Sequence, residues 1–174
     1  MHQIQQAVTG RACTLSDCMS YRYALEERWG PGGLVAFICH NPSTATDTQA
    51  DHTFSRMRNF VRKWGYGALV VGNRFAGGRS PTVQKLDHMA DPIGPENDWH
   101  IARIAERADL IVLAWGNLPC PPERTEAVIK ILAAAGKPLH CLGRTNSGNP
   151  KHPSARGRAS IPRDAQPIPW MPAK

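Results

Sequence analysis

The sequence predicts an α/β domain in which helices on both sides cover a mainly parallel, four-stranded central sheet. Two observations support this fold. Short runs that are wholly or largely apolar, as in strands buried within a sheet, occur at residues 34–39, 68–71, 110–115 and 138–142. Segments with apolar residues at helical spacing lie between them. This alternation is typical of three-layer α/β/α sandwiches with right-handed crossovers.

The remaining elements follow from local patterns. Residues 21–25 (YRYAL) alternate in polarity and predict an edge strand. Residues 51–65 predict the first helix, with an aspartate placed to cap its start and a glycine placed to end it. Two further helices are expected over 96–107 and 121–135. Residues 76–95 predict a long loop rich in Gly, Ser, Pro and Asp, and loops of that length are often functional.

Length and composition predict a single domain. The chain has 174 residues, of which 41% are hydrophobic, and no linker divides it. Residues 20–170 are expected to form the core and residues 1–19 an N-terminal extension. No apolar run approaches the ~20 residues that span a bilayer, and the N-terminus lacks the pattern of a signal peptide. We therefore expect a cytoplasmic monomer that does not bind membranes.

The net charge of +7 favours a polyanionic partner. The alternative is a merely basic, solvated surface. Five cysteines are spread along the chain with no zinc-ligand spacing, so neither a metal nor a cofactor is expected. The basic residues form two groups in the sequence: Arg56, Arg58, Arg62 and Lys63, then Arg144, Lys151, Arg156, Arg158 and Arg163.

Ligands of open α/β sheets bind outside the carboxyl ends of the strands. Four segments directly follow predicted strands and are therefore candidates for one site: residues 40–47, 72–75, 115–117 and 144–156.

The first segment offers Asn41, held extended by Pro42, for binding a base edge or orienting a water. The alternative is a turn residue that caps the following helix. Ser43 and Thr44 are ordinary cap residues, although backbone amides in this loop could receive a phosphate. Asp47 is a candidate general base or a second capping residue.

The middle segments offer Asn73, Phe75 and Trp115. An aromatic ring there can stack on a base and an amide can hydrogen-bond its edge, while burial in the core is the alternative. The last segment offers His152, which can hydrogen-bond a developing anion near neutral pH. The residues around it are candidates for contacting phosphates: Arg144, Lys151, Ser154, Arg156 and Arg158.

Taken together, YRYALEERWG, FICHNPSTATD, RKWGYGALVVGNRFA, DPIGPEND, AWG and LHCLGRTNSGNPKHP resemble the DUF1643 family of small bacterial and phage proteins. This resemblance covers roughly residues 20–170. The Asn-Pro motif after the first core strand and the His-Pro-Ser motif near the C-terminus also look like the uracil-DNA glycosylase superfamily, which implies its fold.

That second resemblance implies a role for each matching residue. Asn41 would position the water, His152 would stabilise the leaving base and Phe75 would stack on it, while Ser154 and Arg156 would touch DNA. Asn41 stands where the superfamily usually has a water-activating aspartate. Pro42-Ser43 replaces the Pro-Tyr of the strict uracil enzymes, so the small serine would leave room for a bulkier base.

The resulting hypothesis is a monofunctional DNA glycosylase. It would flip and excise a bulky 5-substituted pyrimidine, such as glucosylated hydroxymethylcytosine of phage DNA, leave an abasic site and act in antiviral defence. Three alternatives stay open: a uracil or damaged-base repair glycosylase, an enzyme of free nucleotides or nucleosides, and a non-catalytic nucleic-acid-binding module.

Overall fold

The computed structural model describes residues 10–78 and 86–170. Within these ranges the chain forms seven strands, three α-helices and one short 3₁₀ helix. In chain order they are β1 (Gly10–Leu15), β2 (Arg22–Arg28), β3 (Leu34–Cys39), α1 (His52–Lys63), β4 (Ala68–Asn73), α2 (Asn97–Arg107), β5 (Leu110–Leu113), α3 (Pro122–Ala133), β6 (Leu139–Cys141), η2 (Gly157–Ala159) and β7 (Ile168–Pro169).

The strands form one mixed sheet in the order β1-β2-β4-β3-β5-β6-β7. The four strands expected from the apolar runs are its parallel centre, β4-β3-β5-β6. Antiparallel strands extend this centre on both sides, so the expectation of a mainly parallel, four-stranded sheet is wrong in size and in character. The α/β class itself is confirmed.

The extra strands were missed because their sequences carry little apolar signal. Gly10–Leu15 was assigned to the N-terminal extension, yet it pairs with β2 along its whole length. Its residues alternate between exposed and half-buried, so only one face meets the protein. Residues 21–25 were expected at an edge, but β2 lies between β1 and β4. At the other edge, β7 is only two residues long and exposed.

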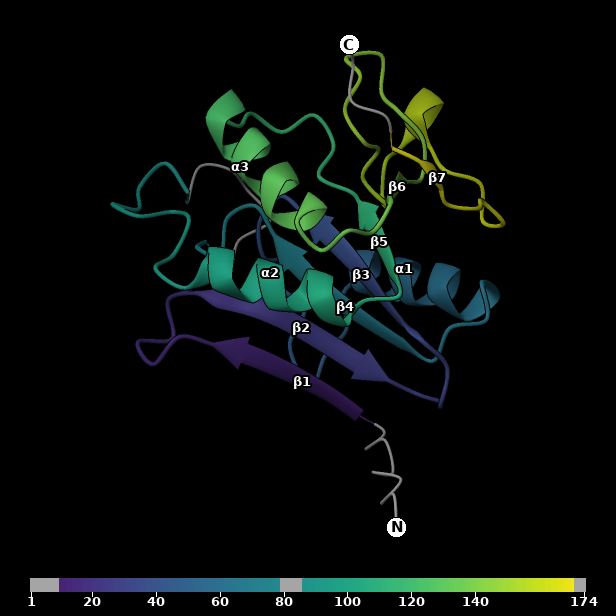
Figure 1. Cartoon of the computed structure of the whole chain (residues 1–174), viewed down its shortest axis with the longest axis horizontal. Helices are drawn as coiled ribbons and strands as arrows, with labels where there is room; N and C mark the ends of the chain where they lie inside the picture. Colours follow the sequence, from purple (N-terminus) through teal and green to yellow (C-terminus); the bar gives the residue numbers. More distant parts are fainter. Residues whose placement is uncertain (1–9, 79–85, 171–174) are drawn as a thin grey trace.

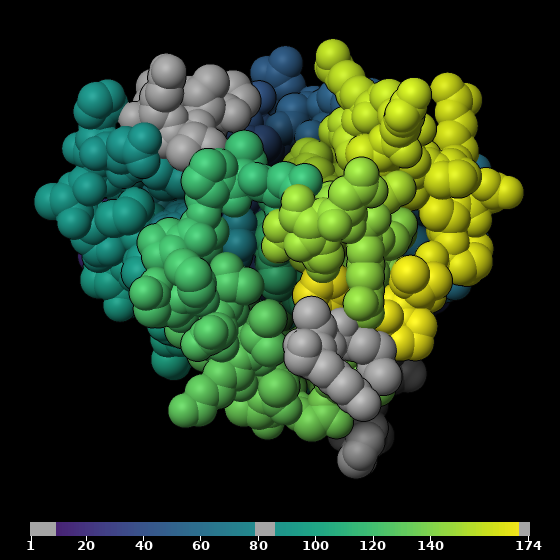
Figure 2. Space-filling view, turned by 90° about the horizontal axis from the view of Figure 1, so that it is seen from above, coloured from purple at the N-terminus to yellow at the C-terminus, as the bar shows by residue number. Residues whose placement is uncertain are grey.

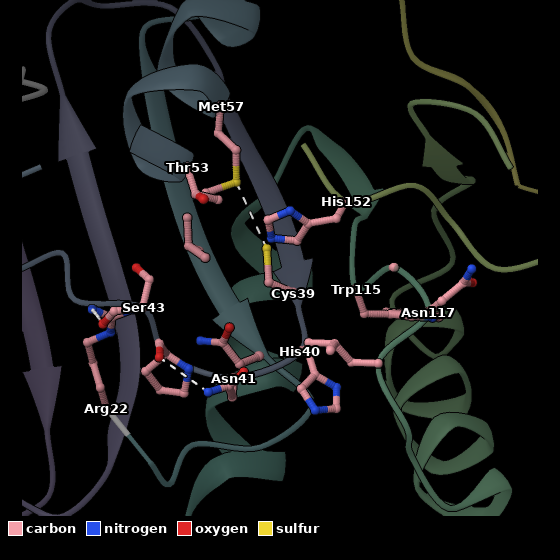
Figure 3. A pocket seen from close by; sticks show the side chains of 15 residues that line it. Arg22, Cys39, His40, Asn41, Ser43, Thr53, Met57, Trp115, Asn117 and His152 are labelled. Carbon is pink, nitrogen blue, oxygen red and sulfur yellow. Dashed lines mark hydrogen bonds between the residues drawn. The ribbon is translucent and has the colours of Figure 1, made fainter. Parts of the chain in front are cut away.

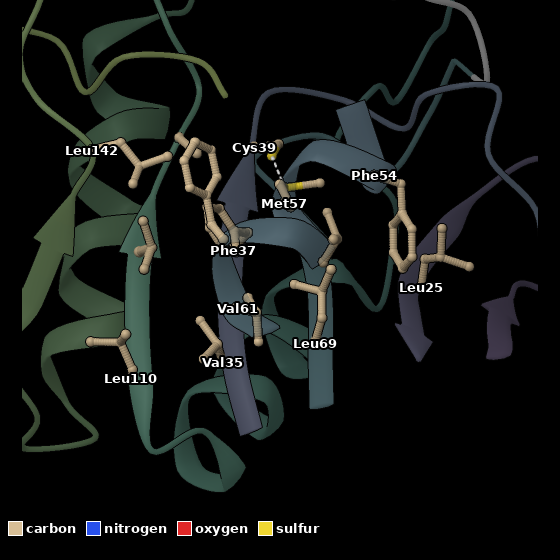
Figure 4. Packing of buried hydrophobic residues seen from close by; sticks show 14 of the residues in the cluster. Leu25, Val35, Phe37, Cys39, Phe54, Met57, Val61, Leu69, Leu110 and Leu142 are labelled. Atoms are coloured by element: carbon tan, nitrogen blue, oxygen red, sulfur yellow. Dashed lines mark hydrogen bonds between the residues drawn. The ribbon is translucent and has the colours of Figure 1, made fainter. Parts of the chain in front are cut away.

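The helices divide between the two faces of the sheet (Figure 1). On one face α1 packs its buried residues, Phe54, Met57, Phe60 and Val61, against alternate residues of the strands (Figure 4). On the other face α2 and α3 pack together against the intervening strand residues. β3, β4 and β5 are consequently buried on both sides, which explains why their sequences are almost entirely apolar.

The start of α1 is set by Asp51, whose carboxylate accepts a hydrogen bond from the Phe54 N–H at 2.7 Å. This confirms the capping role expected for Asp51. Arg62 and Lys63 in the last turn of the helix lie near the negative end of its dipole.

The order of the parallel strands creates a crevice at their carboxyl ends. The chain passes from β3 through α1 to β4 on one side, then returns through α2 to β5 on the other side of β3. The loops that leave β3 and β5 therefore diverge, and this is the switch point where open α/β sheets bind ligands. In the part of the chain that the structure describes, no helix is long and apolar enough to span a membrane.

The turns that precede β3 and β4 pack closely against each other at Gly67. Its carbonyl accepts from the Trp29 N–H at 2.9 Å, and an added Cβ would lie 2.4 Å from the Gly32 nitrogen. Backbone atoms cannot yield to such a clash, so Gly67→Ala is expected to lower the free energy of unfolding by at least about 2 kcal/mol.

Gly30→Ala is the matched control, because its added Cβ would come no closer than 3.9 Å to another atom. Urea denaturation of both variants checks the prediction. Equal stability of the two would show that the turns do not pack as closely as the structure indicates.

Candidate functional site

A pocket of about 450 Å³ opens at the carboxyl ends of β3, β4 and β5 (Figure 3). Figure 2 looks onto this edge, where the green segment after β5 lies beside the yellow-green segment after β6. The walls of the pocket come from the loop after β3, the start of α1 and the loop after β5. The lining residues are Arg22, Cys39, His40, Asn41, Pro42, Ser43, Thr53, Met57, Val71, Asn73, Trp115, Gly116, Asn117, Leu118 and His152.

The pocket gathers six of the residues singled out from the sequence. Asn41, Pro42 and Ser43 come from the loop after β3, and Asn73 ends β4. Trp115 follows β5 and His152 follows β6, so four strand ends contribute. The fold thus brings Asn41 and His152 to one cavity, although more than a hundred residues separate them.

Three other candidates lie outside the pocket. Thr44 and Asp47 are exposed, because the loop after β3 turns outward and closes on itself through the Thr46 N–H and the Gln49 carbonyl at 2.7 Å. Phe75 is 7% exposed and packs edge-on against the ring of His40, with centroids 5.2 Å apart. Phe75 therefore belongs to the wall behind the pocket and is not placed to stack on a ligand there.

Of the residues expected to contact phosphates, the three arginines are exposed, whereas Lys151 and Ser154 are partly buried. Arg156 and Arg158 are exposed beside the pocket loop. Arg144 is also exposed, with its guanidinium 4.9 Å from the centre of the Trp170 ring, and Lys151 is half-buried. The Ser154 hydroxyl turns inward and shares a 3.0 Å hydrogen bond with Thr53, so it ties the His152 loop to α1.

The loops after β5 and β6 are locked together beneath His152. The Gly116 N–H donates to the Pro150 carbonyl at 2.9 Å, and the Asn117 side-chain oxygen accepts from Thr145 and Asn149 at 2.8 and 3.1 Å. Gly116 has φ +68°, and a Cβ there would meet the His152 Cβ at 3.2 Å. Glycine at 116 therefore lets His152 sit close against the end of β5.

His152 is held as a neutral hydrogen-bond donor. Its Nδ1 accepts from the Ser154 backbone N–H at 3.2 Å, which leaves the proton of the neutral ring on Nε2. Burial lowers the pKa of His152 below its ordinary value of 6.5, while the charge of Asp51 acts in the opposite direction. At neutral pH the ring is therefore uncharged.

His40 is a second histidine of the same kind, which the sequence did not single out. Its Nδ1 lies 2.7 Å from Nη2 of Arg74, and a guanidinium can only donate, so the neutral ring carries its proton on Nε2. Burial, followed by the charges of Arg74 and His152, lowers the pKa of His40 to about 4. Among the described residues, Nε2 has no hydrogen-bond partner.

Arg74 itself is 2% exposed, and none of the ion pairs formed by the described residues includes it. It donates to the Thr125 hydroxyl at 2.9 Å, and its guanidinium lies 4.9 Å from the centre of the Trp115 ring. Burial lowers its pKa to about 10, so it is charged at neutral pH. The sequence feature that could have identified Arg74 as part of the site is its position directly after Asn73, at the end of a buried strand.

The inner wall of the pocket combines hydrogen-bond donors with apolar side chains such as Met57 and Val71. Three lining residues, His40, Asn73 and Trp115, each have a buried side-chain nitrogen without a partner in the described part of the chain. Arg22 adds a guanidinium, which donates to the carbonyls of Ser43 and Ala45. No aspartate or glutamate is among the lining residues described. An unpaired buried donor costs about 1–3 kcal/mol, so this wall favours a ligand rich in acceptors or negative charge.

Two other kinds of chemistry find no support at this pocket. Burial raises the pKa of Cys39 to about 12, so its thiol is not an activated nucleophile at neutral pH. Within residues 10–78 and 86–170, no group of three or more His, Cys, Asp or Glu side chains could hold a metal ion.

The fold and the pocket define an α/β protein with a pocket that contains several hydrogen-bond donors at the switch point of its parallel strands. The chain belongs to the family described as "Protein of unknown function (DUF1643)", whose model matches residues 22–154. That range contains every residue that lines the pocket. Neither the curated proteins nor the solved structures contain a match to this chain.

The environment of His40 predicts a loss of stability in acid. Its pKa is about 4 in the folded protein, below the ordinary 6.5, so between these values the unfolded chain binds a proton that the folded chain does not. This contribution is absent above pH 6.5 and grows as the pH falls toward 4, where it reaches about 3 kcal/mol of destabilisation.

His40→Asn keeps an acceptor for Arg74 but cannot titrate. We expect the variant to lose less stability than the parent protein between pH 7 and pH 4.5 in urea denaturation. If both lose the same amount, His40 is not the group that makes folding sensitive to acid.

Proposed function

We propose that the chain is a monofunctional DNA glycosylase that receives a flipped base in the pocket at the ends of β3 and β5. The observation that carries this proposal is the meeting of Asn41 and His152 in one cavity whose inner wall has donors and no carboxylate. Their motifs, Asn-Pro and His-Pro-Ser, resemble those of the uracil-DNA glycosylase superfamily.

The chemistry suits such a wall because a base leaves its sugar with the electron pair of the N-glycosidic bond. Negative charge then develops on the base, and donors that are already oriented stabilise it without reorganisation. His152, a neutral Nε2–H donor, is the group we assign to this role. His40 and Asn73, behind it, strengthen the positive potential of the wall or bind other acceptors of the base.

Asn41 is assigned to the attacking water. Its side-chain nitrogen donates to the carbonyls of Gly78 and Pro42 at 3.2 and 3.4 Å, which fixes the plane of the amide. The amide oxygen can then accept from a water but cannot deprotonate it. The water oxygen bonds to an oxocarbenium-like C1′ as the C–N bond breaks, and the proton released neutralises the departing base.

The size of the pocket favours a modified base. Its volume of about 450 Å³ lies in the range of sites for drug-sized ligands, and the small side chain of Ser43 lines it. The substrate we assign to this space is a pyrimidine with a bulky 5-substituent, such as glucosylated hydroxymethylcytosine of phage DNA. Excision of such bases would leave abasic sites in phage DNA and serve antiviral defence.

An enzyme of free nucleotides is the second candidate. The observation in its favour is that Arg22 lines the pocket and Arg74 lies behind it, because buried guanidinium groups suit a phosphate as well as a base. A free-nucleotide enzyme would process nucleotides and leave oligonucleotides intact.

The proposal is tested with duplex and single-stranded oligonucleotides that carry uracil, hydroxymethylcytosine or glucosylated hydroxymethylcytosine. Alkaline treatment cleaves the strand wherever a base has been released. We expect cleavage at the glucosylated base. Intact strands in every case, with turnover of the matching free nucleotides, would replace the glycosylase proposal with the second candidate.

Variants assign the roles within the pocket. Asn41→Ala and His152→Ala are each expected to slow base release at least ~100-fold without unfolding the protein, because each removes a group that acts on the transition state. His152→Gln keeps a donor near the position of Nε2 and should recover part of the loss. Single-turnover rates measure both effects.

Asp47→Asn is the control, because this exposed carboxylate lies outside the pocket, and its rate should match that of the parent protein. A loss as large as that of Asn41→Ala would instead give Asp47 a part in the reaction. Normal rates for both alanine variants would move the site elsewhere.

A further inference from the structure

A second concavity, of about 540 Å³, runs along the outer side of α1 and is referred to below as the α1 groove. One wall is the polar face of the helix, and the segment around Arg163 forms the other. The lining residues are His52, Ser55, Arg56, Asn59, Phe60, Arg62, Lys63 and Arg163.

The α1 groove concentrates positive charge that is not neutralised locally. Four of its lining residues are arginine or lysine, and none is acidic. None of these four takes part in an ion pair formed by the described residues. Arg58, on the same helix, is different because it pairs with Glu27 at 3.2 Å and does not line the groove. The basic group read from the sequence is thus divided, and its unneutralised members share one groove.

Specific contacts hold the two walls together. The Lys63 ammonium donates to the Arg163 carbonyl at 2.9 Å, and the Trp64 indole N–H donates to the Ala165 carbonyl at 2.9 Å. Arg56 donates to the carbonyl of Ile161, which is buried against α1. The C-terminal segment is therefore docked on α1, and the groove is a built feature of the fold.

The groove and the pocket share α1 as a common wall. Thr53 and Met57 line the pocket, and their neighbours in sequence, His52 and Arg56, line the groove. The 12 residues of α1 make it about 18 Å long, which is roughly five base steps along the axis of a B-form duplex at about 3.4 Å each, so the groove spans several nucleotides. A strand lying in the groove would therefore reach the mouth of the pocket.

We propose that the α1 groove binds the phosphates of a nucleic-acid strand and leads that strand to the pocket. This inference rests on the proposed function, because an enzyme that excises bases from DNA must hold the backbone beside the flipped nucleotide. Guanidinium and ammonium groups without acidic neighbours attract a polyanion through release of its counterions, independently of base sequence. Phe60, at the base of the groove, is buried under the Arg56 guanidinium, which lies 5.5 Å from the centre of its ring.

The test uses a fluorescently labelled single-stranded oligonucleotide of ordinary bases and measures binding by anisotropy at several salt concentrations. The variant Lys63→Gln/Arg163→Gln removes two exposed charges of the groove, and glutamine at 63 keeps a donor for the segment opposite. We expect at least ~10-fold weaker binding at low salt. The plot of log K against log salt should become shallower by about 1.4, since each lost contact to a single strand contributes about 0.7.

The matched control is Arg103→Gln/Lys130→Gln, which removes the same charge from exposed positions of α2 and α3, across the sheet from α1. Its binding and salt dependence should match those of the parent protein. If the control loses as much affinity as the groove variant, binding follows net charge alone. If the groove variant binds normally, the strand lies elsewhere. Either result overturns the inference.

The same oligonucleotide separates this inference from the proposed function, because it contains no base to be excised. Groove-dependent binding together with no release of any modified base would contradict the glycosylase and support the groove. Base release by a groove variant that binds normally would support the glycosylase and contradict the groove.

Discussion

The site depends on the contacts of one buried group, the guanidinium of Arg74. It joins the end of β4 to α3 through Thr125, lies over the ring of Trp115 after β5, and donates to His40 after β3. No carboxylate neutralises it among the described residues. Burial, and after it the charge of Arg74, lowers the pKa of His40, and the hydrogen bond from Arg74 fixes the tautomer of that ring. A buried cation that no described carboxylate neutralises favours an anionic or acceptor-rich ligand nearby.

The two histidines of the pocket show how one fold can hold the same chemistry twice. In each, Nδ1 accepts a hydrogen bond, from Arg74 for His40 and from the Ser154 backbone for His152, and burial keeps the ring neutral. A neutral imidazole donor of this kind does not change its protonation state when the pH varies around neutrality. It can therefore stabilise negative charge without becoming charged itself. The α1 groove supplies full positive charge outside the pocket, where solvent makes charge inexpensive to maintain.

Much of the central architecture was predictable from the sequence. The runs at 34–39 and 68–71 form β3 and most of β4, because strands buried on both faces carry mainly apolar residues. Asp51 was correctly expected to cap α1, since capping depends on a carboxylate three residues before the amide it accepts from. The edge strands β1 and β7 could not be predicted, because strand pairing stabilises them while their side chains remain largely in solvent.

For the site, the sequence by itself determined which segments leave the strands at their carboxyl ends. It therefore predicted that these segments share one site, and Asn41, Asn73, Trp115 and His152 do line one cavity. Tertiary structure alone decided which polar residues face that cavity. His40 and Asn41 are neighbours in an equally polar loop, yet only the position of Arg74, contributed by another strand, makes His40 a fixed neutral donor. Asp47 was an equally reasonable candidate until the turn at Thr46 and Gln49 placed it in solvent. The positions of the central strands along the chain are encoded locally in apolar patterning, whereas the partner of a side chain depends on loops that only the whole fold brings together.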